Sequence, residues 1–126
     1  MIHTDFFQAY DKGQRHFCNL DFEYLEGFAG KDFSDVVFEQ CFLYIDFRNS
    51  NLTNAQFVGC NLKEIDLRNA NLTNALMKNC LVESAMFKGA VVANFRFIDN
   101  YYYGLTIGQT DFDEKLADQG SFLPNE

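Results

Sequence analysis

The sequence from Ile45 to Asp99 reads, in blocks of five, IDFRN SNLTN AQFVG CNLKE IDLRN ANLTN ALMKN CLVES AMFKG AVVAN FRFID. The third position of every block is large and apolar: Phe47, Leu52, Phe57, Leu62, Leu67, Leu72, Met77, Val82, Phe87, Val92 and Phe97. The first position is mostly small, as in Ala55 and Cys60, and the other positions are mainly Asn, Asp, Thr, Arg, Lys and Gly. Each block therefore offers two residues to a core and three to solvent.

A period of five suits neither common element of secondary structure. On an α-helix, five residues turn the chain by about 500°, so the large residues would scatter around the axis. On a flat strand, an odd step would send every second one to the opposite face. A chain that turns a corner after every block keeps them all inside. Four such sides close a square coil of about twenty residues, and stacked coils pair as a parallel β-helix.

A twenty-residue coil places residues twenty apart directly above one another, and these are often identical here. The stacked pairs include Asp46 and Asp66, Arg48 and Arg68, Asn49 and Asn69, Asn51 and Asn71, Thr53 and Thr73, and Cys60 and Cys80. The five-step also extends towards the N-terminus through Phe28, Phe33, Phe38 and Leu43. Leu43 to Phe47 is a step of four, which indicates one residue lost at a corner. Before Phe28 the repeat phase stays open.

The blocks ANLTN, SNLTN and CNLKE resemble the A(D/N)LXX consensus of the pentapeptide-repeat family, and the resemblance covers roughly residues 17–103. It implies an all-β fold, a right-handed quadrilateral β-helix, often dimeric through its C-terminal end. Some members of this family resemble B-form DNA in width and charge, bind type II topoisomerases, and protect them from quinolones.

We expect one domain over residues 1–126, with an N-terminal cap (1–16), the β-helix (17–103) and a C-terminal cap or dimer element (104–126). Thr4 is expected to cap a short helix that stops at Gly13, and Thr110 a second one that stops at Gly120. The residues proposed for the C-terminal cap are equally suited to a dimer face: Tyr101, Tyr102, Tyr103, Phe112 and Leu116.

The net charge of −8 sits at the two ends of the chain. Residues 1–40 carry eight acids and three bases, residues 41–98 four and six, and residues 99–126 six and one. This distribution argues against direct nucleic-acid binding, which favours a basic stripe. The acidic surface expected to meet a partner comprises Glu23, Glu26, Asp32, Asp35 and Glu39. The sequence has neither a run of 18 apolar residues nor a signal-peptide pattern at its start, so a cytoplasmic location without membrane contact is expected.

The residues offer little for catalysis. Cys41, Cys60 and Cys80 fall at the inward small position, where a buried reduced thiol is the expected role. His16 and Cys18 are close in sequence, but two residues make neither a zinc site nor an oriented dyad. The stacked Asp and Arg side chains are expected to form a solvated ladder, and the Asn residues to occupy corners. We therefore expect no enzyme activity, no metal and no cofactor.

Two functional hypotheses remain. The first is a protein-binding scaffold or adaptor that uses a flat face of the solenoid or an acidic end. The second, taken from the family resemblance, is an acidic DNA mimic that binds and protects or inhibits a type II topoisomerase such as DNA gyrase. The near-neutral middle of the repeat argues against an evenly charged rod.

Overall fold

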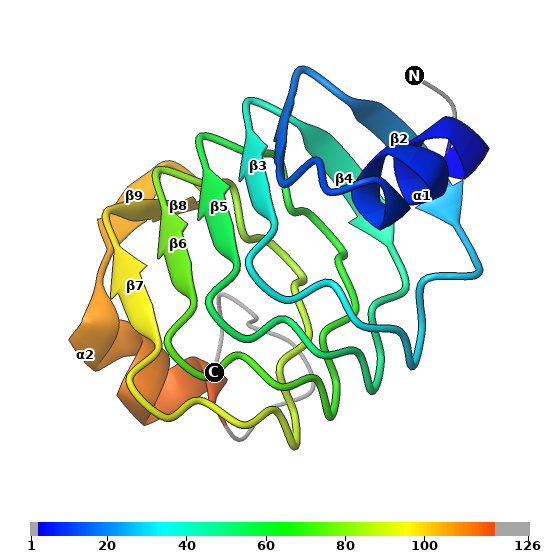
Figure 1. Ribbon diagram of the computed structural model, residues 1–126. Coiled ribbons are helices and arrows are strands. Elements are labelled where there is room, and N and C mark those ends of the chain that lie inside the picture. Colours follow the sequence, from blue (N-terminus) through cyan, green and yellow to red (C-terminus); the bar gives the residue numbers. More distant parts are fainter. Residues whose placement is uncertain (1–2, 118–126) are drawn as a thin grey trace.

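The computed structural model describes residues 3–117 of the chain. They form a β-helix of stacked square coils with a helix at each end, and Figure 1 shows the coils succeeding one another along the axis from the blue end to the orange end. The predicted right-handed quadrilateral β-helix is confirmed. None of the helices among residues 3–117 is long and apolar enough to cross a membrane.

Backbone pairing defines the four sides of the solenoid. Side A is a five-stranded parallel sheet whose strands follow in the order β1 (His16–Cys18), β3 (Val37–Glu39), β5 (Gln56–Val58), β6 (Leu76–Lys78) and β7 (Arg96–Ile98). Side B contains β2 (Asp21–Leu25), β4 (Phe42–Ile45) and single bridges through Asn61, Leu81 and Tyr101. Side C is a ladder of bridges through Asp46, Asp66 and Met86, and side D one through Asp32, Asn51, Asn71 and Val91.

The coils differ slightly in length, and both differences lie at one corner. On side A, Phe17 pairs with Phe38, Phe38 with Phe57, Phe57 with Met77, and Met77 with Phe97. The successive coils thus span 38 − 17 = 21, 57 − 38 = 19, then 20 and 20 residues. The long coil has a six-residue step from Phe22 to Phe28, and the short one a four-residue step from Leu43 to Phe47. Both steps lie between the inward residues of sides B and C, and the register of the β2–β4 pair already shifts between Phe22 and Leu25.

The corners of the repeat have left-handed backbone. The last residue of each of the eleven blocks has a φ between 50° and 77°: Asn49, Asn54, Gly59, Glu64, Asn69, Asn74, Asn79, Ser84, Gly89, Asn94 and Asp99. Asn, Asp and Gly tolerate this conformation best, which explains why they recur there. Gln40 and Asn49 both have a positive φ, but no residue between them does. The residue lost in the four-step is therefore the left-handed corner residue.

The interior of the solenoid is filled by the third residue of each block. All eleven are fully buried except Val92, which is half-buried near the C-terminal end and packs against the core. The first residues line the same interior; Ala55, Ala70 and Ala75, for example, are fully buried. A large and a small residue on each side together fill the square cross-section.

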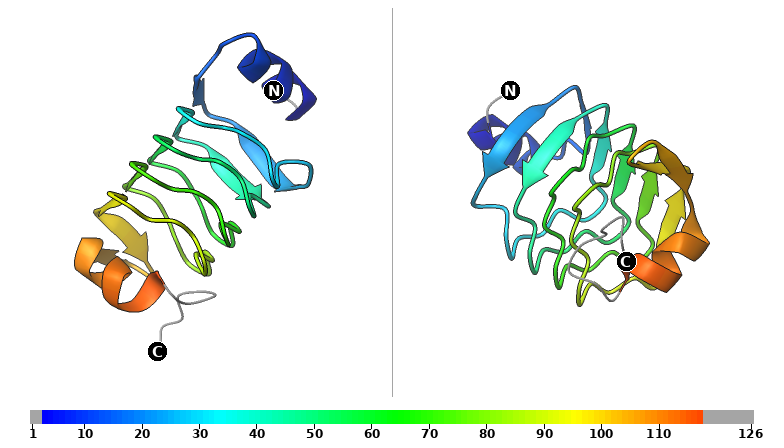
Figure 2. Two further views of the ribbon diagram at one scale, coloured as in Figure 1. Left: turned by 60° about the horizontal axis from the view of Figure 1, so that its bottom comes forward. Right: turned by 180° about the vertical axis from the view of Figure 1, so that it is seen from behind.

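The N-terminal end is closed by α1 (His3–Asp11). Phe6 of this helix is fully buried, and its ring centroid lies 4.6 Å from that of Phe17 and 5.7 Å from those of Phe28 and Phe38. The helix lies across the end of the coil (Figure 2). Thr4 was expected as the N-cap, but it lies inside the helix, which already begins at His3.

The C-terminal end is closed by a hairpin and two short helical turns. Strands β8 (Asn100–Tyr102) and β9 (Leu105–Ile107) pair antiparallel. They lead into α2 (Gln109–Asp111) and the π-helical turn η1 (Phe112–Leu116). Thr110 was expected as N-cap, but Gly108 holds that position, and its N–H donates to Asp111 Oδ2 at 3.0 Å. The expected stop at Gly120 lies outside the described residues.

Candidate functional site

The five acids proposed as one partner-binding surface do not form a single patch. Glu23 lies in β2 on side B, and Glu26 follows directly after that strand. Asp32 belongs to the bridge ladder of side D, Asp35 to the corner after it, and Glu39 to β3 on side A. The structure thus distributes them around the first coils over sides B, D and A, because corners of the square separate Glu26 from Asp32 and Asp35 from Glu39.

Two of these acids are occupied in holding adjacent coils together. Asp32 Oδ1 accepts the backbone N–H of Ser34 at 2.9 Å and Nδ2 of Asn51, in the next coil, at 3.2 Å. The hydrogen bond from Ser34 N–H lowers the pKa of the Asp32 carboxyl. Asp35 Oδ1 likewise accepts Nδ2 of Asn54 at 3.0 Å. Their carboxylates therefore have structural partners besides facing solvent.

Side C carries the expected ladder of opposite charges. Arg48 donates from both Nε and a terminal nitrogen to the carboxylate of Asp46, at 2.9 and 2.8 Å. Arg68 does the same to Asp66, at 2.9 and 2.7 Å, and Arg48 Nε lies 3.5 Å from Asp66 Oδ2. The hydrogen bonds from Arg48 lower the pKa of Asp46. Because each carboxylate is paired, this side presents no excess of negative charge.

The C-terminal residues proposed as cap or dimer face divide into two groups. Phe112 and Leu116 are fully buried and Tyr102 nearly so. The Phe112 ring lies 5.0 Å from that of Phe95 and 5.1 Å from that of Phe97. Phe112, Leu116 and Tyr102 therefore close the core. Tyr101 and Tyr103 are exposed, at 37% and 58%. These two tyrosines alone of the proposed set offer contact area to another molecule.

The exposed tyrosines line a shallow groove on side B. We call it the tyrosine groove; its walls are formed by Leu81, Tyr101, Tyr103, Lys63, Glu64 and Glu83. Two contacts join these lining residues: Leu81 pairs with Tyr101 through the backbone, and Tyr103 N–H donates to Glu83 Oε2 at 3.2 Å. Lys63 Nζ lies 3.7 Å from Glu83 Oε1. Sequence reasoning listed the tyrosines but not Leu81 or the charged rim, which come from earlier coils.

The cysteine column is internal and ends in an asparagine. Cys41, Cys60 and Cys80 are buried free thiols, each donating to a carbonyl of the coil before it; Cys80 Sγ lies 3.2 Å from Phe57 O. The hydrogen bond with Cys60 and burial raise the pKa of the Cys41 thiol. Asn100 continues the column and is fully buried. Its side chain accepts from Cys80 N–H and donates to Met77 O, both at 2.9 Å.

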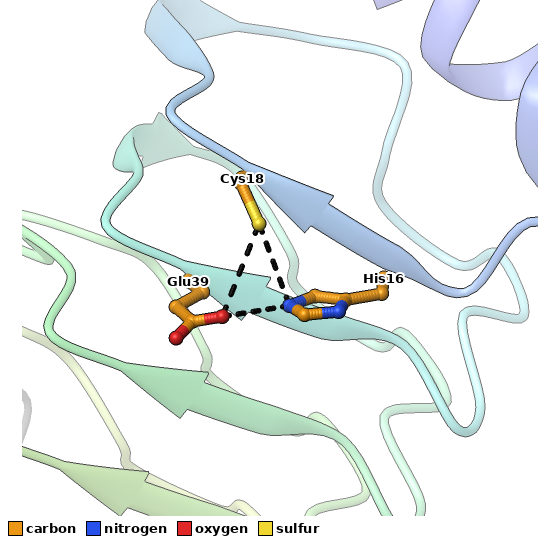
Figure 3. A group of neighbouring side chains, drawn as sticks. All are labelled: His16, Cys18 and Glu39. Atoms are coloured by element: carbon orange, nitrogen blue, oxygen red, sulfur yellow. Dashed lines mark hydrogen bonds and ion pairs between the residues drawn. The ribbon is translucent and has the colours of Figure 1, made fainter.

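A mixed group of His, Cys and Glu lies at the outer surface of side A. His16 and Cys18 are the two outward residues of β1, and Glu39 is the outward residue of β3 that pairs with Cys18. His16 Nε2 lies 2.8 Å from Glu39 Oε1 and 3.5 Å from Cys18 Sγ, and Cys18 Sγ lies 3.9 Å from Glu39 Oε1 (Figure 3). Slight desolvation and the charge of Glu39 raise the pKa of the exposed Cys18 thiol. The thiol is therefore not activated as a nucleophile.

The third member of this group escaped the sequence reasoning, which found His16 and Cys18 but no orienting partner. Glu39 follows Cys18 by 21 residues, the length of the first coil. The irregular phase before Phe28 concealed this offset. The ligand atoms of His16, Cys18 and Glu39 all lie within 4.8 Å of one another. Among the described residues, this is the one group of three or more His, Cys, Asp or Glu side chains that meets this distance.

The fold defines a rigid solenoid repeat protein whose repeat unit is five residues. The family described as pentapeptide repeat region matches residues 31–107, more than half of the chain, and this protein therefore belongs to the pentapeptide-repeat family. A sequence comparison with curated proteins returns no match.

Comparison with solved structures finds similar proteins, among them QnrB1 and Rfr23. A trypsin-treated form of QnrB1, described as a plasmid-mediated fluoroquinolone resistance protein, superposes with a TM-score of 0.51 at 22% identity, over 69% of this chain and 53% of QnrB1. Rfr23, a pentapeptide repeat protein from the cyanobacterium Cyanothece 51142, gives a TM-score of 0.40 at 15% identity, over 80% and 95% of the two chains. The present chain thus corresponds to about half the length of QnrB1.

Proposed function

We propose that this protein is a non-catalytic binding scaffold and that the tyrosine groove holds its protein partner. The observation that carries the proposal is the exposure of large apolar side chains on a rigid hairpin. Tyr101, Tyr103 and Leu105 are 37%, 58% and 65% exposed, and all belong to the β8–β9 hairpin or its turn. Tyrosine contributes large contact area at small conformational cost, which suits a binding surface.

The charge around the groove indicates the chemistry of the partner. Glu64 and Glu83 lie on its walls with one cation, Lys63. In the sequence, residues 99–126 are also acidic, with six acids and one base. A segment with an aromatic or aliphatic anchor flanked by Lys or Arg would satisfy both features, because apolar contact supplies affinity and charge complementarity supplies specificity. A second copy of this chain would instead bring like charge against like charge.

The proposal is tested by selecting peptides from a random displayed library against the purified protein. Enriched peptides should combine an apolar anchor with flanking Lys or Arg. Their affinity should fall at least tenfold for a Tyr101→Ala/Tyr103→Ala double variant and stay unchanged for Val91→Ala, which removes an exposed apolar residue from side D. Equal binding to both variants, or enrichment of acidic peptides, would contradict the groove assignment. Sedimentation velocity would reveal a homodimer if the hairpin served self-association instead.

The second candidate is an acidic DNA mimic acting on a type II topoisomerase. It is supported by the net charge of −8 and by the fold shared with a fluoroquinolone resistance protein. The dispersal of the five acids and the paired carboxylates of side C weaken it. A DNA gyrase supercoiling assay, with and without ciprofloxacin, distinguishes the two candidates. The DNA mimic predicts protection or inhibition that weakens with added salt.

Matched variants sharpen that assay. Asp32→Asn and Asp35→Asn keep the oxygen that accepts the structural hydrogen bonds and remove only the charge. Their combination with Glu39→Gln should abolish an effect on gyrase that depends on charge mimicry, and it should leave peptide binding at the tyrosine groove intact. If this combined variant lost peptide binding but kept its effect on gyrase, the acids would belong to the peptide site and not to a gyrase-binding surface.

A further inference from the structure

We infer that His16, Cys18 and Glu39 form a binding site for a single Zn²⁺ ion on the outer face of side A. The three side chains project from two neighbouring parallel strands, β1 and β3, towards one point in front of the sheet (Figure 3). An imidazole nitrogen, a thiolate sulfur and a carboxylate oxygen are the three ligand types by which proteins hold zinc. The three ligand atoms already lie close together, so binding an ion requires no change of the backbone.

The separations of the ligand atoms suit tetrahedral zinc. With usual zinc–ligand bond lengths, tetrahedral geometry places nitrogen and oxygen about 3.3 Å apart and sulfur about 3.6 Å from either. The observed separations are 2.8 Å between His16 Nε2 and Glu39 Oε1, and 3.5 and 3.9 Å from Cys18 Sγ to His16 and Glu39. Each atom therefore needs to move by no more than roughly half an ångström, which side-chain rotation on an exposed face can supply.

The neighbours of His16, Cys18 and Glu39 on the sheet add no further metal ligand. The register pairs His16 with Val37 and Cys18 with Glu39, and Glu39 in turn with Val58, so valines flank the group on the same face. The nearby buried thiol of Cys41 turns inward, to the carbonyls of Phe17 and Glu39. Three protein ligands and a water would complete the tetrahedron, which leaves one position open to solvent.

The mixed donor set distinguishes zinc from the abundant hard cations. Mg²⁺ and Ca²⁺ prefer shells made of oxygen alone, and a single carboxylate holds either one weakly. Zinc takes Cys18 as the thiolate, whose proton passes to solvent on binding. Since β1 and β3 belong to successive coils, the bound ion would join the first coil to the second and stabilise the N-terminal end of the solenoid.

The test uses the full chain without a polyhistidine tag, reduced and freed of metal. Zn²⁺ is titrated against a competing chromophoric chelator, and Co²⁺ is added as a spectroscopic probe. We expect one ion per chain, a thiolate-to-cobalt charge-transfer band, and the visible spectrum of four-coordinate cobalt. The thermal unfolding midpoint should rise with zinc concentration, because the ion binds the folded state. Mg²⁺ and Ca²⁺ should produce neither effect.

Variants decide between this site and nonspecific binding. His16→Ala and Cys18→Ser should each weaken zinc binding at least tenfold, and Cys18→Ser should abolish the charge-transfer band. Because all three residues are partly or fully exposed, the metal-free variants should keep the circular dichroism of the parent. His3→Ala and Glu23→Gln remove the other histidine and an acid of side B, and should bind zinc like the parent. Absence of binding at micromolar zinc, or binding that survives Cys18→Ser, would overturn the inference.

Discussion

The phenyl ring of Phe112 stands edge-on to that of Phe87, with ring centroids 5.1 Å apart and planes at 89°. This contact joins the C-terminal cap to the last complete coil, and a second ring pair with Phe95 at 5.0 Å reinforces it. Edge-to-face packing of this kind adds to the burial of the ring itself. Phe112 therefore belongs to the core of the single chain.

We expect Phe112→Ala to lower the free energy of unfolding by about 3 to 5 kcal/mol, the usual cost of removing a buried phenyl ring. Urea denaturation followed by circular dichroism measures the change. Tyr103→Ala, which removes an exposed ring from the neighbouring hairpin, should cost far less. A Phe112→Ala variant that keeps its stability but changes its oligomeric state would show that this residue is an interface residue instead.

The register of the repeat is tested by a pair of neighbouring residues in β5. Phe57 is fully buried and Gln56 is exposed, although they are adjacent in sequence. Phe57→Asp places an unpaired charge in the core, at a cost comparable to the whole stability of a small domain, and should abolish cooperative folding. Gln56→Asp should fold normally. A soluble Phe57→Asp protein with a cooperative unfolding transition would show the register to be wrong.

The left-handed corners predict a clear order of substitutions at Asn74, which has a φ of 60° and is exposed. Asn74→Ala should destabilise the protein by about 1 to 2 kcal/mol, since a Cβ in this conformation is strained and asparagine tolerates it better than alanine. Asn74→Gly should be nearly neutral. Thermal or chemical denaturation of the two variants gives the comparison. Equal stability of the alanine and glycine variants would argue against corner strain as the reason for asparagine.

The Asp46–Arg48 pair predicts a dependence of stability on pH. The pKa of Asp46 is lower in the folded protein than its usual value of about 3.9. Its contribution is therefore fully present above that value and is lost as the pH falls through the lower, folded-state pKa. Asp46→Asn should cost at most about 1 kcal/mol near neutral pH.

The difference between parent and Asp46→Asn should shrink as the pH is lowered from 5 towards 2, because the parent carboxyl then becomes protonated. Urea midpoints measured across this range test the sign. The asparagine keeps an oxygen for the Arg48 backbone N–H, so the comparison isolates the charge. A difference that grows on acidification would contradict a lowered pKa.

The sequence was sufficient for the solenoid because its repeat is local: the third residue of each block must point inward for the coil to close. The same reasoning located Cys41, Cys60 and Cys80 inside. It did not extend to Asn100, the polar end of their column, whose side chain is satisfied by Cys80 N–H and Met77 O. A buried asparagine is acceptable there because two backbone groups of the coil before it match its amide, and sequence alone does not show those partners.

The sites were harder to predict than the fold, since they depend on which coil lies beside which. The five acids appeared as a group because they are near one another in sequence, whereas in space they are spread over three sides of the solenoid. Glu39 escaped notice as a partner of His16 and Cys18 because the first coil has 21 residues and not twenty. The helix starts expected from caps at Thr4 and Thr110 were each two residues too late, since the helices begin at His3 and Gln109.

The extra residue of the first coil and the missing residue of the second lie at the same corner, between sides B and C. The strands of side A remain in continuous register through both irregularities, with Phe17, Phe38 and Phe57 stacked in one row. Length changes at this corner are thus absorbed within a single turn of the chain and do not propagate along the axis. For protein engineering, this corner is the natural point at which to graft a foreign loop onto the solenoid.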